Sequence, residues 1–368
     1  MAVKQTIWSI EPHTQAKHAI LDRYLKAWFP IMSKWNGRIL YVDGFAGPGK
    51  YLNDKDLPLI DGSPLIALNA AREHKLQLNA EIVFLFIEAR HDRYEYLKSL
   101  LESIHIPKNM RYEVIESKFD ETISSLLDYL DEQKERLAPA FVFIDPFGYS
   151  ETPFSVIERI MENPRCEVLV TFMYSFIKRA IAKPDQEEHL DILFGTQEWR
   201  KIRDIGIPLK KQEFAQELYQ KQLEEEAKIK YVRFFEMINR FNQPEYLLFF
   251  GTNNKKGLKE MKRAMWKVDP EGAFRFSDRT NPKQRVLFEP EPNYNLLKRL
   301  ITERFSGKAV PIEQIEEFVI VETPFRETHF KNPILNPMEN ASSPEIVVSG
   351  RRRKGTYPAG TVVQFLTI

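Results

Sequence analysis

The sequence predicts an α/β protein built around a mostly parallel sheet that has helices on both faces. Between residues 38 and 174, short apolar runs of strand length alternate with segments of helical periodicity. The runs are apolar at consecutive positions, as expected of strands that are buried on both faces. Several of them end in a glycine or an acidic residue, and ligands of open α/β sheets bind at the carboxyl ends of the strands. Together these observations indicate a ligand-binding parallel sheet.

Length, charge and cysteine content restrict the number of domains and the kinds of binding site that the protein can have. A chain of 368 residues fits two domains, and its 53 Lys and Arg residues balance 52 Asp and Glu residues. The protein therefore has no overall basic field, and any contact with nucleic acid has to come from a local patch. The single cysteine, Cys166, excludes a disulfide framework and a cysteine-based zinc cluster. We expect it at the start of a buried strand.

The N-terminal segment predicts the compartment. Residues 1–25 lack the basic region and the apolar block of a signal peptide. No apolar run reaches the roughly 20 residues that span a bilayer. We therefore expect a soluble, cytoplasmic protein that makes no membrane contact.

The first half of the chain supplies the predicted sheet. Residues 14–35 carry apolar side chains at helical spacing, and the apolar run 38–45 breaks into glycines, as a strand does when it enters a turn. Ser63 is expected to cap the next helix, with Pro64 in its first turn. The remaining elements alternate strictly: strand 81–88, helix 92–103, strand 111–116, helix 119–135, strand 140–149, helix 153–162 and strand 166–174.

A helical insertion is expected after the fifth strand. Residues 177–230 are rich in charged side chains and contain few apolar anchors, so we place them beside the sheet. Strand character returns at 244–254, followed by a helix over 257–268. Residues 230–238 are the expected antiparallel partner of that strand. Residues 1–280 are thus predicted to form one Rossmann-like domain.

The C-terminal part predicts a second, smaller module. A linker containing Pro and Asn follows Asp278. Helices over 294–305 and around 310–323, a third short helical stretch and a hairpin-like tail come next. Three short helices followed by a two-stranded hairpin describe a winged helix. Residues 281–368 are therefore predicted to form a winged-helix-like module.

The turn that follows the first strand has the composition of a nucleotide-cofactor loop. Gly47 and Gly49 allow the backbone to turn sharply and to approach a ligand where a Cβ atom would collide. Phe45 lies inside the same turn, as a further cofactor contact. Asp43 is placed where a carboxylate can pair with the cationic amino-acid end of S-adenosylmethionine. A tight loop without a ligand is the alternative.

Acidic and polar residues end the next two strands. Glu88 is placed to accept hydrogen bonds from both hydroxyls of a ribose, although an acid at a strand end can also simply be solvated. After the third strand, Glu116, Ser117 and Asp120 can contact the amino group of an adenine. Ser117 or Asp120 can equally cap the helix that follows, so this assignment stays open.

The fourth strand ends in a segment suited to a planar amine. Asp145 and a nearby backbone carbonyl can accept hydrogen bonds from the amine, while Phe147 or Tyr149 stacks on the ring that carries it. Such a site fits a base lifted out of its helix, because its exposed ring needs a partner. The alternative is that Asp145 supports the cofactor from behind and the aromatic residues serve packing.

These segments carry a family resemblance. In order, DGFAGPGKY, GSPL, the Glu88 strand and FIDPFGY resemble the bacterial three-Cys-motif partner protein family. Residues 8–30 and 247–266 follow the same pattern, and the resemblance covers most of the chain up to residue 330. Phe147 departs from a related pattern, since amino-methyltransferases usually carry a second proline at that position.

The resemblance implies a fold, a cofactor and a partner. The fold is that of a Rossmann-like methyltransferase, and the partner is a separate three-Cys-motif protein similar to radical S-adenosylmethionine enzymes. Asp43, Gly47 and Gly49 would bind S-adenosylmethionine, and Glu88 would bind its ribose. Asp145 would lie at the reaction centre.

A basic turn lies between two strand-like runs near the C-terminus. Arg351, Arg352, Arg353 and Lys354 would place four cations beside a phosphate backbone if this turn is the tip of a wing. A solvated basic turn is the alternative.

Other cations at helical spacing carry weaker signals. His13, Lys17 and His18 lack a matching acid pair, so we expect surface or packing roles for them and predict no metal. The second basic set can border a nucleic-acid groove or be an ordinary solvated helix face: Lys255, Lys256, Lys259, Lys262, Arg263 and Lys267.

The sequence therefore predicts an S-adenosylmethionine-dependent methyltransferase that acts on nucleic acid, DNA rather than RNA, at an exocyclic amine. Asp145 would orient the amine, and the methyl group would move by direct in-line displacement. The alternative is a non-catalytic partner that binds DNA through its winged helix and works with a three-Cys-motif protein. A dehydrogenase is disfavoured, because the glycine turn differs from Gly-x-Gly-x-x-Gly.

Overall fold

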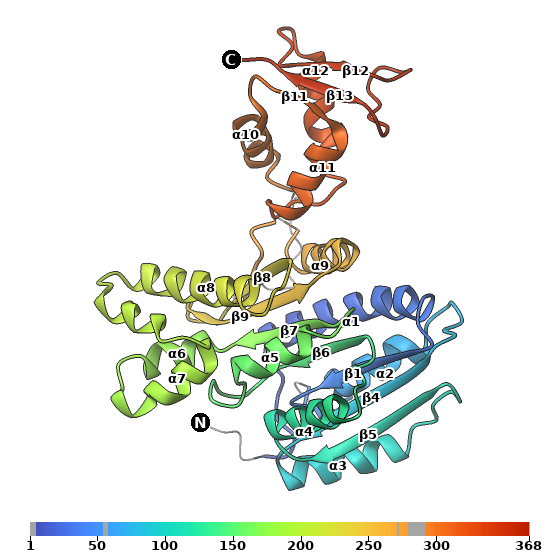
Figure 1. The fold of residues 1–368 in the computed structure, drawn as a ribbon, viewed down its shortest axis with the longest axis vertical. Helices are drawn as coiled ribbons and strands as arrows, with labels where there is room; N and C mark the ends of the chain where they lie inside the picture. Colours follow the sequence, from blue (N-terminus) through green and yellow to red (C-terminus); the bar gives the residue numbers. More distant parts are fainter. Residues whose placement is uncertain (1–4, 54–57, 271, 279–290, 368) are drawn as a thin grey trace. The chain divides into compact units, whose positions relative to one another are not determined.

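A computed structural model describes residues 5–53, 58–270, 272–278 and 291–367 (Figure 1). They form two compact units. The first comprises Met1–Gly257 and Phe276–Asn281, and the second comprises Leu258–Arg275 and Pro282–Ile368.

The first unit is built on a mostly parallel sheet, which confirms the predicted fold class. Its strands are β1 (Arg38–Asp43), β4 (Glu81–Glu88), β5 (Met110–Glu116), β6 (Ala140–Ile144), β7 (Glu167–Phe172), β8 (Tyr231–Ile238), β9 (Pro244–Thr252) and β10 (Arg275–Ser277). In the described part of the chain the order is β10-β8-β9-β7-β6-β1-β4-β5. The strands β1, β4, β5, β6 and β7 run parallel, and β9 is antiparallel to β7 and β8. The predicted antiparallel pairing of residues 230–238 is therefore confirmed.

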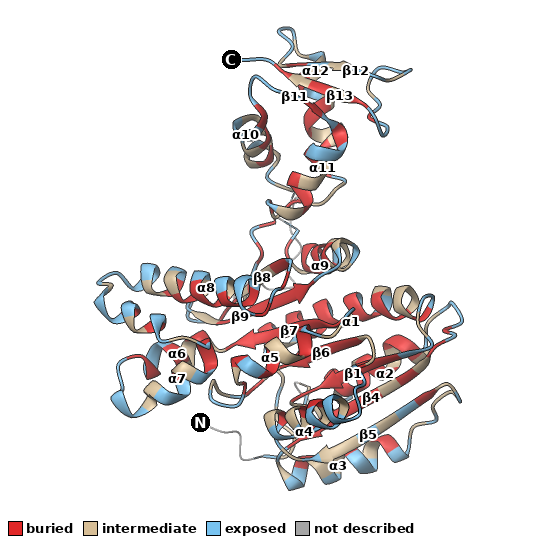
Figure 2. Cartoon of the chain, in the orientation of Figure 1, coloured by how far each residue is buried: buried red, intermediate tan, exposed pale blue. Residues whose placement is uncertain are grey.

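Helices cover both faces of this sheet, so its central strands are buried along their length (Figure 2). These helices are α1 (Pro12–Ser33), α2 (Ser63–Arg72), α3 (His91–Glu102), α4 (Phe119–Glu132) and α5 (Phe154–Met161). On one face, Tyr24 of α1 packs against Phe141 of β6, with ring centroids 5.2 Å apart. On the other face, Phe119 and Ile123 of α4 join the cluster that contains Val42 of β1. The continuous apolar runs follow from this two-sided packing.

Local details differ from the expectations at two places. The cap of α2 is Gly62 rather than Ser63, and no side chain caps this helix. The fourth predicted strand, 140–149, ends at Ile144. Pro146 lacks the N–H group that would continue the ladder, so Asp145 becomes the first residue of the loop. A short pair, β2 (Lys50–Tyr51) and β3 (Ile60–Asp61), flanks the irregular loop after β1.

The insertion buries more apolar surface than its charged sequence suggests. It comprises α6 (Tyr174–Ala180), η1 (Pro184–Gln186), α7 (Glu187–Phe194), η2 (Glu198–Asp204) and α8 (Pro208–Glu225). Trp199 and Tyr219 are fully buried. The ring of Tyr219 lies 4.5 Å from that of Phe172 on β7 and 5.2 Å from that of Phe249 on β9. The expectation of few apolar anchors is wrong, because single aromatic residues among the charged ones reach the sheet.

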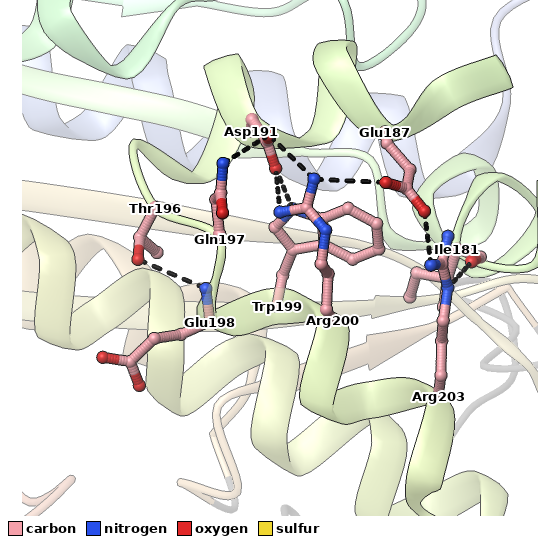
Figure 3. A network of polar contacts seen from close by, with 9 residues as sticks. All are labelled: Ile181, Glu187, Asp191, Thr196, Gln197, Glu198, Trp199, Arg200 and Arg203. Atoms are coloured by element: carbon pink, nitrogen blue, oxygen red, sulfur yellow. Dashed lines mark hydrogen bonds and ion pairs between the residues drawn. The ribbon is translucent and has the colours of Figure 1, made fainter. Parts of the chain in front are cut away.

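A polar network fixes η2 to α7 (Figure 3). Asp191 accepts hydrogen bonds from Trp199 Nε1 at 2.7 Å and from Arg200 Nη1 at 2.7 Å. Arg200 also pairs with Glu187 at 3.2 Å, and Glu187 accepts a further bond from Arg203. The indole of Trp199 is thus buried with its only polar atom satisfied, as buried tryptophans require.

The second unit has the element order of a winged helix. Its elements are α9 (Lys255–Val268) from Leu258 onward, α10 (Tyr294–Phe305), β11 (Ala309–Pro311), α11 (Ile312–Val321), η3 (Lys331–Leu335), α12 (Asn336–Asn340), β12 (Ile346–Ser349) and β13 (Val362–Phe365). The predicted hairpin gains a third strand, and the sheet has the order β11-β13-β12. Most of the predicted linker, 279–290, lies outside the described residues.

Part of the predicted basic helix face is internal to the second unit. Lys262 is buried, and its ammonium group donates to the backbone carbonyls of Val319, Ile320 and Thr323 at 2.8–3.0 Å. These carbonyls lie at or just beyond the C-terminal end of α11, where a cation is stabilising. Lys259 pairs with Glu316 at 2.9 Å. The two lysines therefore hold α9 to α11.

The cysteine lies where we expected it. Cys166 directly precedes β7, and burial raises the pKa of its thiol to about 12. In the part of the chain that the structure describes, no helix is long and apolar enough to cross a membrane.

The buried indole of the insertion provides a test of the packing. We expect Trp199→Ala to lower the free energy of unfolding by about 3–5 kcal/mol, because it removes a fully buried indole and leaves a cavity. Glu198→Ala, one residue earlier and exposed, is the matched control and should change stability by less than about 0.5 kcal/mol. Urea denaturation followed by circular dichroism measures both. Equal effects of the two substitutions would contradict the packing described here.

Candidate active site

The candidate site lies where three strands of the first unit end side by side. β1 lies between β4 and β6 in the sheet, so the segments that follow Asp43, Glu88 and Ile144 meet at one edge. Ligands of open α/β sheets bind at this edge. The fold thus brings together the glycine loop, the acid of the second strand and the Asp145 segment.

Backbone geometry accounts for the glycines of the loop. Gly47 has φ of +61° and Gly49 has φ of +76°, values in the left-handed region that favours glycine. At Gly44, a Cβ atom would lie 2.4 Å from the ring of Phe119 at the start of α4. The loop backbone can therefore approach α4 only because no side chain intervenes.

Glu88 is held in a fixed orientation at the end of β4. One carboxylate oxygen accepts the N–H of Gly47 at 2.9 Å, and the other accepts the N–H of Arg90 at 2.8 Å. Burial raises the pKa of Glu88, while the two backbone hydrogen bonds and the nearby arginines act in the opposite direction. Each oxygen keeps a lone pair for a further donor, so the carboxylate can accept two ligand hydroxyls.

Two adjoining cavities lie over this edge. The first, of about 140 Å³, includes Glu88 and Ser117 in its wall. The second, of about 260 Å³, includes Lys17 and Asp145 in its wall. The rings that line both cavities are those of Phe45 and Phe147. The two cavities therefore adjoin at Phe45 and Phe147, and a ligand in the first would lie next to a molecule in the second.

Asp43 lies beneath the loop and is absent from the walls of both cavities. Its side chain is fully buried and hydrogen-bonds to Ser63. The N–H of Phe45 and the hydroxyl of Tyr41 lie 3.4 Å from its oxygens. Burial raises the pKa of Asp43 to about 7, the charge of Asp145 adds to the rise, and the hydrogen bond from Ser63 opposes it. The structure therefore gives Asp43 contacts that support the loop, and Ser63 serves this carboxylate instead of capping α2.

Asp145 is paired with a lysine that the sequence did not connect to it. The Nζ atom of Lys17, on α1, lies 2.6 Å and 2.5 Å from the two carboxylate oxygens. The side chains are 6% and 19% exposed, so Asp145 retains some accessible surface. The same ammonium group lies 4.9 Å from the ring centroid of Tyr246. A buried pair of this kind has a fixed geometry, because separating the charges would leave each of them uncompensated.

An aromatic and cationic stack covers the junction of the cavities. The guanidinium carbon of Arg93 lies 4.5 Å from the ring centroid of Trp8 and 4.7 Å from that of Phe147. Trp8 is held by the backbone, since its carbonyl accepts the N–H of Leu52 at 2.9 Å. Phe147 thus lies at the candidate site, and the segment around Trp8 forms part of its wall.

The other predicted site residues have mixed positions. Ser117 lines the first cavity, but no side chain caps α4, so neither Ser117 nor Asp120 is a helix cap. Glu116 pairs with His91 and lines neither cavity. Tyr149 hydrogen-bonds to Gln186 and also lines neither cavity.

Two polar residues on the buried side of α1 were missed as part of the site. His13, Lys17 and His18 are all buried, which fits the packing alternative that was expected, and His13 and Lys17 also line the second cavity. Burial disfavours the charged form of His13, but its hydrogen bonds to Glu11 and Asp278 prevail and raise its pKa. Burial lowers the pKa of His18 to about 3, so its ring is neutral. The available signal was the position of these polar groups on the apolar face of an amphipathic helix.

In the basic turn of the second unit, one cation has a side chain that is only 7% exposed, and the other three are exposed. The guanidinium of Arg351 pairs with Glu339 of α12, and it lies 5.3 Å from the ring centroid of Tyr357. Arg352, Arg353 and Lys354 are exposed. Arg351 therefore fixes the turn against α12, and the other three cations face solvent.

The described residues contain no group of three or more His, Cys, Asp or Glu side chains that could hold a metal ion.

Comparisons with known proteins give one family match and several similar structures. A family model described as a GMT-like wHTH domain matches residues 275–338. No curated protein matches the chain. A Legionella pneumophila protein of the family DUF519 is 17% identical, with 66% of this chain and 85% of that chain covered and a TM-score of 0.40.

Two further structures are those of methyltransferases. Trm1 from Pyrococcus horikoshii, solved in complex with S-adenosyl-L-methionine, is 11% identical, with coverage of 82% and 74% and a TM-score of 0.37. A SAM-dependent methyltransferase from Methanosarcina mazei is 12% identical, with coverage of 61% and 97% and a TM-score of 0.30. The family match covers only the C-terminal part, so the resemblance to the three-Cys-motif partner proteins stays a prediction. The case for a function rests on the geometry of the site.

The buried carboxyl group of Asp43 predicts a pH dependence of stability. Because its pKa is about 7 in the folded protein, against an ordinary value of 3.8, the folded state holds a proton that the unfolded state has lost between these values. Rising pH therefore removes stability across this window.

We expect Asp43→Asn, which cannot ionise, to become progressively more stable than the wild type as the pH rises from about 4 to about 7. Asp128→Asn on the exposed side of α4 is the control and should show no such trend. Thermal unfolding at a series of pH values measures the difference, and a constant difference would contradict the buried, proton-holding state of Asp43.

Proposed function

We propose that the first unit is an S-adenosylmethionine-dependent methyltransferase and that its acceptor is an exocyclic amine of nucleic acid. One observation carries the proposal. Glu88, oriented by the amides of Gly47 and Arg90, lies in the wall of a cavity that shares Phe45 and Phe147 with the cavity of Asp145. In this proposal, the acid that binds the ribose and the acid that binds the amine lie in adjoining cavities.

The residues of the first cavity fit an adenosyl group. Glu88 offers two lone pairs to the ribose hydroxyls, and Ser117 and Phe119 line the same space. Glu151 adds a second acid to the wall, which Arg90, Arg93 and Lys118 also line, so the wall carries charges of both signs. A dehydrogenase is disfavoured by the glycine turn, which differs from Gly-x-Gly-x-x-Gly.

Bound in the first cavity, the cofactor supplies an electrophilic methyl group. The chain's own residues orient the acceptor. The exposed part of the Asp145 carboxylate accepts a hydrogen bond from the amine, and Lys17 holds that carboxylate in place. Phe147 and Trp8 line the acceptor cavity, where a planar base can contact the sides of their rings that face away from Arg93.

Nucleic acid as the acceptor is supported by the second unit. A wHTH family model matches part of it, and three exposed cations lie on its basic turn. Cations on a projecting turn bind phosphate groups irrespective of sequence. Arg352, Arg353 and Lys354 are the residues proposed for this contact.

A non-catalytic partner protein is the second candidate function. Lys17 contacts both oxygens of Asp145, and Phe147 stands where amino-methyltransferases usually carry a second proline. Both features favour a site that binds cofactor without transferring its methyl group. In this alternative a three-Cys-motif protein would be the partner.

Cofactor binding tests the first step of the proposal. We expect Glu88→Gln to weaken binding of S-adenosylmethionine by about ten- to a hundredfold, because a charge-assisted hydrogen bond to a hydroxyl is lost. Isothermal titration calorimetry measures the affinity, with NADH as a competing ligand that should not bind.

Glu116→Gln is the matched control, since Glu116 ends the neighbouring strand in register with Glu88 but lines neither cavity. It should leave the affinity unchanged. Failure of the wild type to bind S-adenosylmethionine would overturn the proposed function, and equal binding by both variants would remove Glu88 from the site.

Methyl transfer tests the second step. We expect Asp145→Asn to lower kcat by about a hundredfold or more, with little change in cofactor affinity, because only orientation of the acceptor is lost. Transfer of the labelled methyl group from the cofactor to mixed DNA and RNA measures kcat.

Glu245→Gln is the control, since Glu245 lines the same cavity but bonds to Ser175 and Asn239. Turnover that survives in Asp145→Asn would remove Asp145 from the mechanism, and cofactor binding by a wild type without turnover would favour the non-catalytic partner.

A further inference from the structure

A groove in the second unit combines a row of amide side chains with a cationic turn. Asn332, Asn336 and Asn340 follow one another at intervals of four residues along η3 and α12, and all three line the groove. Arg353 and Lys354 line the same groove. Asn332 and Asn340 are exposed, and Asn336 is half-buried.

The backbone that carries the amides has an uncommon conformation. The carbonyl of Phe330 accepts the N–H groups of both Ile334 and Leu335, and the bond to Leu335, which spans five residues, makes η3 a π-helical turn. Pro333 and Pro337 lack N–H groups and disturb the regular helical bonding. Single π-helical turns are rare and are frequent at functional sites. This turn sets where Asn332 lies relative to the α12 residues.

The turn that carries these cations is held in place by contacts of Arg351 and Tyr357. Arg351 pairs with Glu339, and the hydroxyl of Tyr357 donates to the same carboxylate at 3.1 Å. A Cβ atom at Gly355 would lie 3.5 Å from Oδ1 of Asn336, so the turn lies directly beside the amide row. The spacing between the amides and the cations is therefore set by the fold.

Charge and chemistry identify the ligand class. The groove contains Lys331, Arg353 and Lys354, and its one acid, Glu327, is paired with Arg263 at 3.0 Å. Lys331 lies 3.5 Å from Glu316, so Arg353 and Lys354 supply most of the uncompensated positive charge. The excess of positive charge suits a phosphate backbone. Carboxamide side chains can bond in pairs to N6 and N7 of adenine in the major groove of DNA.

We infer that this groove binds duplex DNA and that the asparagine row reads adenine-containing base pairs. Asn332 contacts base edges together with Asn336, while Arg353 and Lys354 hold the neighbouring phosphates. Oδ1 of Asn336 accepts a hydrogen bond from Nδ2 of Asn340 at 2.6 Å and keeps its second lone pair for a base. Duplex RNA fits less well, because its major groove is too deep and narrow for side chains to read. The inference rests on the nucleic-acid part of the proposed function and is independent of methyl transfer.

Selection from random duplexes tests the inference with the full chain. The probe is a pool of DNA duplexes of about 20 base pairs, or two helical turns, and fluorescence anisotropy then measures affinity for the enriched duplex and for versions with single A·T pairs changed to G·C. We expect the wild type to enrich sites that contain adenine and to bind a changed site about tenfold more weakly.

Substitutions in the groove distinguish recognition of base edges from contact with phosphate groups. Asn332→Ala and Asn336→Ala should lose this tenfold discrimination. Arg353→Ala should weaken binding to all duplexes alike and lower the salt slope by about 1. Gln314→Ala, an exposed amide on α11 outside the groove, is the matched control and should bind as the wild type does. Thermal unfolding checks that each variant is folded. If Asn336→Ala is destabilised, the test relies on Asn332→Ala, because Asn332 is exposed.

Three results would overturn the inference. The asparagines would not recognise adenine if the protein bound all DNA sequences equally. The same conclusion would follow if the discrimination between sequences survived both asparagine substitutions. Equal or tighter binding of duplex RNA would remove DNA as the ligand. A complete lack of DNA binding at low salt would overturn the nucleic-acid part of the proposed function as well, while leaving cofactor binding by the first unit to be judged by calorimetry.

Discussion

Glu88 accepts the backbone N–H groups of Gly47 and Arg90, and it thereby ties the loop after β1 to the start of α3. The rest of the candidate site depends on this contact. It fixes the glycine loop at the edge of the sheet, where the first cavity forms, and it leaves each carboxylate oxygen with a lone pair directed elsewhere. A buried acid is costly unless its hydrogen bonds are made. Two of them are supplied by backbone, so the acid can remain ready for a ligand.

The second half of the site depends on an element that precedes the sheet in the chain. Helix α1 covers one face of the sheet with apolar residues, and the same helix places Lys17 beside Asp145. The pair gives Asp145 a defined orientation, and it also occupies part of the surface that an amine would use. These two consequences are the reason that binding and turnover have to be measured separately. Cofactor binding tests the proposed role of Glu88, and methyl transfer tests the proposed role of Asp145.

Much of the first unit could be predicted because its signals are local. A strand buried on both faces is apolar at consecutive positions, and the acid or glycine that ends it is visible in the sequence, as at Glu88 and Gly47. The hydrogen-bond partner of the buried Asp43 was not visible, because Ser63 lies twenty residues later in a different element. The pairing of Lys17 with Asp145 joins residues 128 positions apart, and no spacing rule relates them. The apolar anchors of the insertion were missed because single aromatic residues stand among charged ones.

For the cations of the second unit, too, the sequence did not show which side chains are buried. Lys262, Arg351 and Arg353 look alike in the sequence, yet only Arg353 is exposed. Lys262 is buried against three carbonyl groups, and Arg351 is buried against a carboxylate. Removing a cation from water requires such partners, and these are assembled only by the tertiary fold. A basic cluster therefore overstates the charge available to a ligand. What remains exposed beside the asparagine row is a smaller set, and its fixed position relative to the amides is what allows phosphate contact and base reading to occur together.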